Sequence, residues 1–204
     1  MQRKEHWEAL YETKPSDTVS WYEPLPSRSL TLLTDAGLNP DSAVLDVGGG
    51  DSRLAGAVVD RDVRDITVLD LSGAALRRAQ ADLGDRAGRV RWIEGDITTV
   101  ELPPSAFDFW HDRAVFHFLT ADEDRARYVA TAARSVRIGG TVIVATFALD
   151  GPTRCSGLEV VRYSPEGLAQ AFGEAFDLRQ GFVDVHRTPT GAEQRFSFAV
   201  LSRV

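Results

Sequence analysis

The sequence predicts an α/β fold in which a mostly parallel sheet is covered by helices on both faces and closed by an antiparallel hairpin. Short apolar runs alternate along the chain with segments of helical composition, and acidic or glycine-rich turns follow several of these runs. Such alternation is typical of a parallel sheet. The chain then ends on two strand-like segments joined by a turn at residues 188–191, which predicts the hairpin.

The N-terminal part of the chain is predicted to be a helical lid. Residues 1–40 form this lead-in, and residues 41–204 form the core that it covers. Trp7 and Tyr11 share one face of the first predicted helix. Pro26 precedes a second helix. No repeat or long linker interrupts the chain, so we expect a single domain.

Five apolar segments are predicted to be the parallel strands of the core. They cover residues 43–47, 66–69, 90–93, 107–111 and 141–147. The segments between them are predicted as helices, one of them capped by Ser72. A long helix is expected over residues 122–136, where acidic residues in the first turn complement the helix dipole. Gly139 and Gly140 are expected to end it.

The C-terminal part of the chain departs from this alternation. A loop is expected over residues 148–163. Ser164 and Pro165 then predict a capped helix. The strand-like segments 176–186 and 193–201 follow, and they are the two arms of the predicted hairpin.

The composition excludes several classes of protein. Apolar residues make up 43% of the 204 residues and charged residues 26%, which argues against a disordered chain. With 23 basic and 30 acidic residues the net charge is −7, so we expect neither a nucleic-acid nor a membrane partner. The single cysteine, Cys155, leaves no intramolecular disulfide, and no metal site is expected. Without a signal-peptide pattern, the expected location is cytoplasmic.

A glycine-rich turn follows the first predicted strand and opens a helix, a context in which such turns bind nucleotide-like ligands. Its glycines are Gly48, Gly49 and Gly50. A dinucleotide site would have a further glycine where Arg53 stands, and a phosphate-binding loop would need a lysine. Asp46 and Asp51 flank the turn instead. Carboxylates repel phosphates, so they indicate a cationic ligand without phosphate.

S-adenosylmethionine (SAM) is such a ligand, because it carries an ammonium and a sulfonium group and no phosphate. Asp70 ends the second strand and can accept hydrogen bonds from both ribose hydroxyls, with Leu71 beside it in the same site. Asp96 follows the third strand and can accept the adenine amino group, while Ile97 packs on the ring. Ligands of open α/β sheets bind at the carboxyl ends of the strands, where these acids stand.

These motifs together resemble those of the class I SAM-dependent methyltransferases. They are VLDVGGG at residues 44–50, VLDLS at 68–72 and EGDI at 94–97. The resemblance covers nearly the whole chain. It implies a Rossmann-like seven-stranded sheet with an antiparallel last strand, and S-adenosylhomocysteine as the product. The aromatic lead-in, HDRA at 111–114 and the segment 150–166 resemble the thiopurine methyltransferase branch more closely. The HDRA sequence also resembles small protein lysine methyltransferases.

Candidate catalytic residues follow the fourth strand. In methyl transfer the donor supplies the electrophile, so the protein aligns, desolvates and, where needed, deprotonates the acceptor. Asp112 and Arg113 are expected beside the methyl group. Arg113 is expected to hold the donor's carboxylate or an anionic acceptor, or to form a salt bridge with Asp112 or a helix acid. His117 would share a helix face with Arg113 if the segment is helical, and it is a candidate base. A packed core histidine is the alternative at this position.

Three further residues are predicted to contact the ligands. Trp21 and Tyr22 are expected to belong to the lid, where they shield the sulfonium, stack on the acceptor or simply hold the lead-in to the core. Arg154 is expected to attract an anionic acceptor or to be solvated. The function that the sequence predicts is methyl transfer to sulfur, oxygen or nitrogen of a small molecule. A protein lysine methyltransferase, a non-catalytic SAM-binding module and a nicotinamide dehydrogenase are the alternatives.

Overall fold

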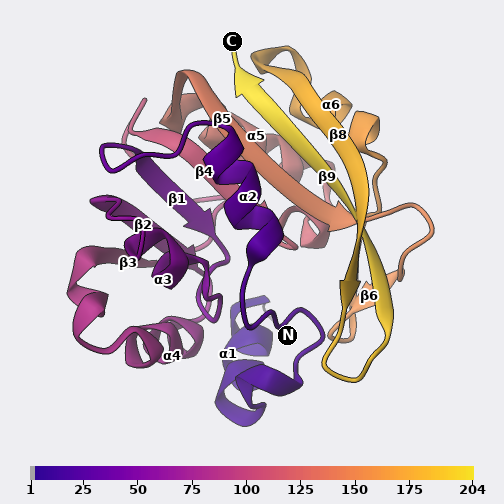
Figure 1. Ribbon diagram of the computed structural model, residues 1–204. Helices are drawn as coiled ribbons and strands as arrows, with labels where there is room; N and C mark the ends of the chain where they lie inside the picture. The colour runs from indigo at the N-terminus through magenta and orange to yellow at the C-terminus, as the bar shows by residue number, and fades with distance from the viewer. Residues whose placement is uncertain (1–2) are drawn as a thin grey trace.

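A seven-stranded, mostly parallel sheet forms the centre of the computed structural model, which describes residues 3–204 (Figure 1). Met1 and Gln2 of the predicted lead-in lie outside the described residues. The strands of the sheet are β1 (Ala43–Val47), β2 (Asp65–Asp70), β3 (Val90–Glu94), β4 (Phe107–Arg113), β5 (Val136–Phe147), β8 (Phe176–Arg187) and β9 (Glu193–Arg203). Their order is β3-β2-β1-β4-β5-β9-β8. Strand β9 runs opposite to the other strands of this sheet and pairs antiparallel with both β5 and β8, which confirms the predicted fold class.

Helices surround the sheet, and a small separate hairpin lies beside it. The α-helices are α1 (Arg3–Thr13), α2 (Ser27–Asp35), α3 (Leu54–Val59), α4 (Gly73–Leu83), α5 (Asp122–Ser135) and α6 (Pro165–Phe172). Short 3₁₀ turns cover Ser16–Thr18, Gly84–Arg89, Phe116–Phe118 and Gly173–Ala175. The small hairpin pairs β6 (Arg154–Cys155) with β7 (Leu158–Glu159), within the segment predicted as a loop.

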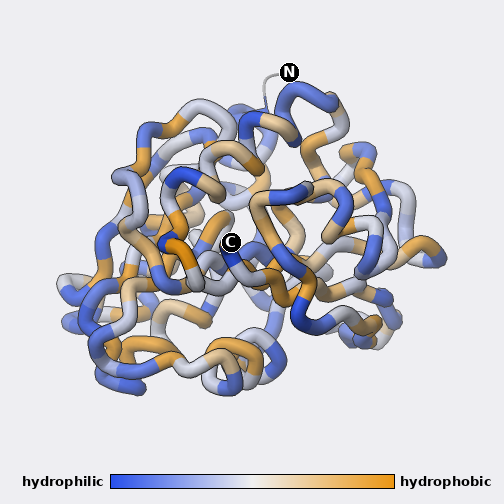
Figure 2. Tube along the Cα trace, turned by 90° about the horizontal axis from the view of Figure 1, so that it is seen from above, coloured by the Kyte–Doolittle hydropathy of each residue, from blue (hydrophilic) through white to orange (hydrophobic). Residues whose placement is uncertain are grey.

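The central strands are apolar on both faces because helices cover both. In β1, Val44 packs in the cluster that contains residues of α2 and α3, whereas Leu45 packs in the cluster that contains residues of α5 and α6. Figure 1 shows α2 crossing in front of the sheet. Hydrophilic segments lie around the outer edge of the trace in Figure 2. The central strand β1 is therefore buried along its length, and its carboxyl end is where a ligand can approach it.

The long helix and the strand after it meet at a different place from the predicted one. Helix α5 ends at Ser135 and β5 begins at Val136, so Gly139 and Gly140 lie inside the strand. The pairing of β4 with β5 shifts register over this stretch. A side chain at Gly140 would come within 2.8 Å of the Val136 side chain and 3.0 Å of a backbone oxygen of β4. The glycines thus permit a bulge and do not end the helix, which corrects the expectation.

Helix α1 lies at the carboxyl ends of the strands and is fastened to α4. Its Glu8 carboxylate accepts hydrogen bonds from the Ser72 hydroxyl at 2.7 Å and from the Ala74 N–H at 3.1 Å. Ser72 in turn caps α4 by accepting from the Ala75 N–H, as predicted. Leu10 of α1 is buried in the same small cluster as Ala75. These contacts hold α1 over the carboxyl ends of the strands.

Candidate functional site

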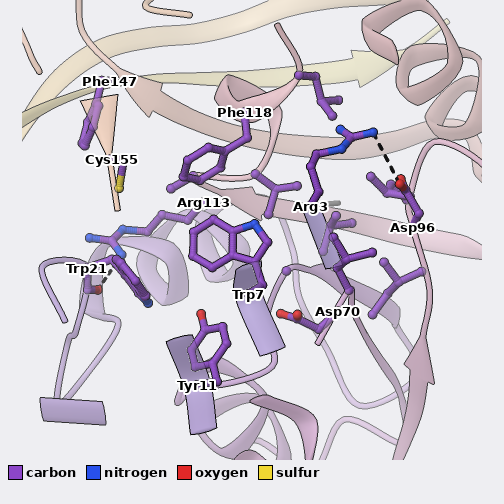
Figure 3. A pocket seen from close by; sticks show the side chains of 18 of the residues that line it. Arg3, Trp7, Tyr11, Trp21, Asp70, Asp96, Arg113, Phe118, Phe147 and Cys155 are labelled. Carbon is purple, nitrogen blue, oxygen red and sulfur yellow. Dashed lines mark hydrogen bonds and ion pairs between the residues drawn. The ribbon is translucent and has the colours of Figure 1, made fainter. Parts of the chain in front are cut away.

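A cavity lies between α1 and the carboxyl ends of the central strands; we call it the main cavity (Figure 3). It encloses about 890 Å³, counting the part that opens to solvent. Asp70 and Asp96 stand at one end in Figure 3, and Phe147 and Cys155 stand at the other. Residues from many regions of the chain contribute to its wall, among them Trp7, Tyr11, Trp21, Gly48, Leu71, Ile97, Arg113, Phe118, Gln194 and Phe196.

A second cavity adjoins the main one on the side of the glycine turn. Tyr11, Trp21, Val47, Gly48 and Arg113 line both. The residues that line only the second cavity include Tyr22, Glu23, Ser29, Asp46, Gly49, Asp51 and His111. The two cavities together therefore pass along the ends of β1, β2 and β4.

The Asp46 carboxylate is oriented by its neighbours in the second cavity. It is only 2% exposed, and its Oδ1 lies 2.7 Å from Nδ1 of His111, which donates to it. The other ring nitrogen of His111 lies 2.8 Å from the Ser29 hydroxyl. Asp46 Oδ2 is buried and has no partner among residues 3–204. A buried carboxylate oxygen without a partner is costly, so it suits a cationic group bound at the turn.

The glycine turn can take this shape only without side chains. A Cβ at Gly49 would lie 2.1 Å from Asp46 Oδ2. At Gly48 the backbone has a φ of +69°, and a Cβ would lie 2.1 Å from the Val115 side chain. Gly50 borders neither cavity, but its N–H donates to Asp70 Oδ2 at 3.0 Å. The glycines thus bring the backbone close to both acids.

The Asp70 carboxylate reaches the main cavity from the end of β2. Its Oδ1 accepts from the Ser72 N–H at 2.8 Å, and its Oδ2 accepts from Gly50. Burial raises the pKa of Asp70 to about 6, although the hydrogen bonds from Ser72 and Gly50 act in the opposite direction. Each carboxylate oxygen has two lone pairs, so both can still accept from a ligand. The geometry therefore fits a pair of ribose hydroxyls.

Leu71, Asp96 and Ile97 complete this end of the main cavity. Asp96 Oδ1 accepts from the N–H of Thr98 at 2.9 Å and from its hydroxyl at 2.7 Å. Asp96 Oδ2 lies 3.4 Å from Arg3. The Asp96 carboxylate was predicted to accept from an adenine amino group, and it is thus already partly occupied by Thr98 and Arg3. Leu71 and Ile97 supply the apolar surface that an adenine ring requires.

Arg113 ties the lead-in to the edge of the sheet. Its guanidinium donates to the Trp21 carbonyl at 3.0 Å, lies 3.0 Å from a Glu23 carboxylate oxygen and stands over the Phe196 ring. Burial lowers the pKa of Arg113, while the charge of Glu23 opposes this shift. Glu23 also lies 3.4 Å from His186 on β8. Arg113 thus pairs with an acid, but the acid is Glu23 of the lead-in and not Asp112 or a helix acid as expected.

The lid aromatics lie in different places. Trp21 lines both cavities, and its ring stands edge-on to that of Trp7, with centroids 5.9 Å apart. Tyr22 lines the second cavity, where the Arg53 guanidinium stands over its ring. Trp21 is therefore placed to contact both halves of a bound donor, and Tyr22 is remote from the aromatic end of the main cavity.

Besides Gly50, three predicted site residues border neither cavity. His117 is fully buried, with its ring 4.4 Å from that of Phe118, and burial lowers its pKa to about 3. Asp112 is also fully buried, and it accepts from the N–H groups of Val115 and Phe116. Arg154 is exposed on β6 and donates to a backbone carbonyl of its own hairpin. This geometry contradicts the catalytic contacts expected of His117 and Asp112 and the substrate contact expected of Arg154.

Replacement of His117 tests its place in the core. The pKa of His117 is lowered in the folded protein, so its contribution to stability is complete above pH 6.5 and is lost as the pH falls toward about 3. His117→Leu removes this titration. We therefore expect the stability of the variant to fall less than that of the wild type between pH 7 and pH 4.5. Thermal unfolding at the two pH values measures the difference, and parallel losses would contradict a buried neutral imidazole.

Sequence reasoning missed the far end of the main cavity. Phe147, Cys155, Gln194 and Phe196 line it from β5, β6 and β9. Alternation of Phe196 with other apolar residues predicted only a strand, and nothing marked Gln194. Trp7 and Tyr11 were expected on one face of a helix, which was a usable signal, but their approach to the cavity depends on how α1 docks.

Part of the chain is similar to known proteins. Residues 44–140 match a family described as a methyltransferase domain. An uncharacterised methyltransferase of Mycobacterium tuberculosis is 38% identical over 104 residues, which are 51% of this chain and 50% of that protein. The chain thus spans about half the length of the first curated relatives it matches. The human eEF1A lysine and N-terminal methyltransferase is 22% identical over 150 residues, covering 71% of this chain and 21% of that protein.

A solved structure extends the likeness over nearly the whole chain. The 1,6-didemethyltoxoflavin-N1-methyltransferase of Burkholderia thailandensis, with 1,6-didemethyltoxoflavin and S-adenosylhomocysteine bound, superposes with a TM-score of 0.73. It is 18% identical, and the match covers 98% of this chain and 87% of that one. At this identity the likeness shows the fold alone.

Residues 44–140 match a methyltransferase domain, and the sheet has the strand order expected of the class I SAM-dependent methyltransferases. SAM is the cofactor of this class, and the free Asp46 oxygen, the Asp70 carboxylate and the apolar pair Leu71 and Ile97 fit its cationic, ribose and adenine parts. Within residues 3–204 no cluster of acidic, histidine or cysteine side chains is arranged to hold a metal ion. In the same part of the chain no helix is long and apolar enough to span a membrane.

Proposed function

We propose that this protein transfers the methyl group of SAM to sulfur, oxygen or nitrogen of a small molecule. The observation that carries the proposal is the continuity of the main cavity. It joins the acids at the ends of β2 and β3 to a compartment walled by Phe118, Phe147 and Phe196. A donor at one end and an acceptor at the other would meet in the middle, beside Trp7 and Arg113 (Figure 3).

The chain's contribution is to hold and desolvate the reactants. SAM, when bound, supplies a methyl carbon already activated by its sulfonium. Asp70 would hold the ribose, Asp46 would face the ammonium, and the aromatic faces of Trp7 and Trp21 would favour a positive charge nearby. The helix α1 covers the cavity and limits water, which strengthens these electrostatic contacts. The geometry offers no base at His117, so it favours an acceptor that reacts as a thiol or after losing its proton to solvent.

The proposal also covers the subgroup, the location and the partners of this protein. The thiopurine methyltransferase branch is compatible with an aromatic acceptor compartment, and we keep it as the proposed subgroup. A cytoplasmic location, and no nucleic-acid or membrane partner, remain part of the proposal, and the net charge of −7 supports the part on partners. A protein lysine methyltransferase is the second candidate, favoured by the match to the eEF1A enzyme. The paired charge of Arg113 and the aromatic walls favour a small neutral acceptor over a lysine side chain.

Incubation with methyl-labelled SAM tests the proposal. Purified protein is offered separate pools of thiols, phenols, amines and peptides, and a cell lysate. We expect label to enter a small-molecule pool. Label confined to peptides or lysate proteins would replace the proposal with the lysine methyltransferase. Binding of SAM without transfer to any pool would favour the non-catalytic module, and thermal protection by NAD but not by SAM would favour a dehydrogenase.

A further inference from the structure

We propose that the acceptor end of the main cavity binds a neutral, planar heterocycle whose edge presents a hydrogen-bond donor next to an acceptor, as a cyclic amide does, and that Gln194 reads this edge. The acceptor end consists of Trp21, Phe118, Phe147, Cys155, Gln194 and Phe196. This inference rests on the proposed function, since it names the substrate class of the same site.

Gln194 brings an amide group to the wall of the acceptor end. Its side chain lines the cavity from the start of β9, and its Oε1 is buried with no partner among residues 3–204. Gln194 as a whole is only partly buried, and its Nε2 is not among the buried atoms without a partner. A buried amide oxygen without a partner is costly. In either orientation the amide presents one acceptor and one donor side by side, which match the N–H and C=O of a cyclic amide.

The walls next to Gln194 are formed by aromatic rings. Gln194 and Phe196 are two residues apart on β9, so their side chains point to the same face. Phe196 pairs in register with Phe147 on β5, and the two ring centroids are 4.9 Å apart. Phe118 adds a third ring to the lining. Aromatic walls of this kind favour a flat ring, whose edge then faces the amide.

The charge beside the aromatic walls is already paired. Arg113 lines the cavity and stands over the Phe196 ring, and its guanidinium is engaged by Glu23 at 3.0 Å and by the Trp21 carbonyl at 3.0 Å. The Cys155 thiol is buried, which raises its pKa and keeps it neutral. The carboxylates Asp70 and Asp96 stand at the opposite end of the cavity (Figure 3). The charge of Arg113 at this end is thus already balanced by Glu23, which favours a neutral ligand over an ionised one.

Paired ligands that differ only in this edge test the inference. Binding to the protein saturated with S-adenosylhomocysteine is measured by calorimetry for 2-quinolone, which has adjacent N–H and C=O groups, and for N-methyl-2-quinolone, which lacks the donor. We expect the wild type to prefer 2-quinolone by about tenfold. Gln194→Leu should abolish this preference while its affinity for S-adenosylhomocysteine stays unchanged. Gln170→Leu, the same substitution at an exposed position on α6, should retain the preference.

The outcomes separate this inference from the proposed function. Equal affinity for the two quinolones in the wild type, no binding of either, or a preference that survives Gln194→Leu would each overturn the role of Gln194. Those results leave the methyl donor site intact as long as S-adenosylhomocysteine binds. Failure of S-adenosylhomocysteine to bind would overturn the proposed function and this inference together.

Discussion

Asp70→Ala is expected to weaken the binding of SAM by about 100-fold or more. The carboxylate stands in the main cavity and would accept from two ribose hydroxyls, and hydrogen bonds to a charged group are each worth about 1.5–3 kcal/mol. Calorimetric titration with SAM measures the loss. Asp65→Ala, the same substitution at the exposed start of the same strand, should leave the affinity unchanged. Equal affinities in wild type and Asp70→Ala would refute the assignment.

The pH dependence of binding gives an independent test of Asp70. Its pKa in the folded protein is raised to about 6, mainly by burial. The hydroxyls of a ligand donate to the charged form, so SAM should bind less tightly as the pH falls through about 6. Asp70→Asn keeps the shape and one acceptor but does not titrate. Its affinity should be lower than that of the wild type at pH 7.5 and should change less between pH 7.5 and 5.

Asp112→Ala is expected to lower the free energy of unfolding by about 3–5 kcal/mol, because it leaves buried donors without an acceptor. The carboxylate accepts from the Val115 N–H at 2.8 Å, the Phe116 N–H at 3.0 Å and the Tyr128 hydroxyl at 2.6 Å. Denaturant unfolding measures the loss. Asp177→Ala, at an exposed position of β8, is the matched control and should change stability little.

The destabilisation should itself depend on pH. Burial raises the pKa of Asp112 to about 6, above its value in the unfolded chain, so the folded protein binds more protons there between about pH 4 and 6. The favourable contribution of this carboxyl group is therefore greatest at low pH and declines as the pH rises through 6. Asp112→Ala should cost more stability at pH 5 than at pH 7.5. A small, pH-independent loss would contradict a structural role for this buried group.

Alternating apolar segments were sufficient to predict most of the fold. The periodicity of a strand or a helix is local, and the five parallel strands, the Ser72 cap and the terminal hairpin follow from it. The ends of the strands were predictable for the same reason. The common location of Asp46, Asp70 and Asp96 was predictable too, because all parallel strands of one sheet end on the same side. The glycine bulge in β5 was not predictable, since its cause is the backbone of β4 across the sheet.

The directions of the side chains in the segment after β4 could not be predicted from the sequence. His117 and Asp112 are of types that serve as acid or base, and their spacing from Arg113 was compatible with a shared face. Their exposure depends on the turn that follows β4, which buries both and leaves Arg113 against the lead-in. The partners of Arg113 are distant in the chain, as Glu23 and Phe196 are. No local pattern encodes such pairings.

The sequence by itself determined the class of fold and the acids that stand at the carboxyl edge of the sheet, the edge proposed to bind the ligand. Both depend on short-range periodicity and on the common direction of parallel strands. Only the tertiary structure decided which side chains meet across that edge. Packing of α1, β5 and β9 around one cavity brings Trp7, Phe147 and Gln194 together from segments far apart in the chain, and burial removes His117 from it.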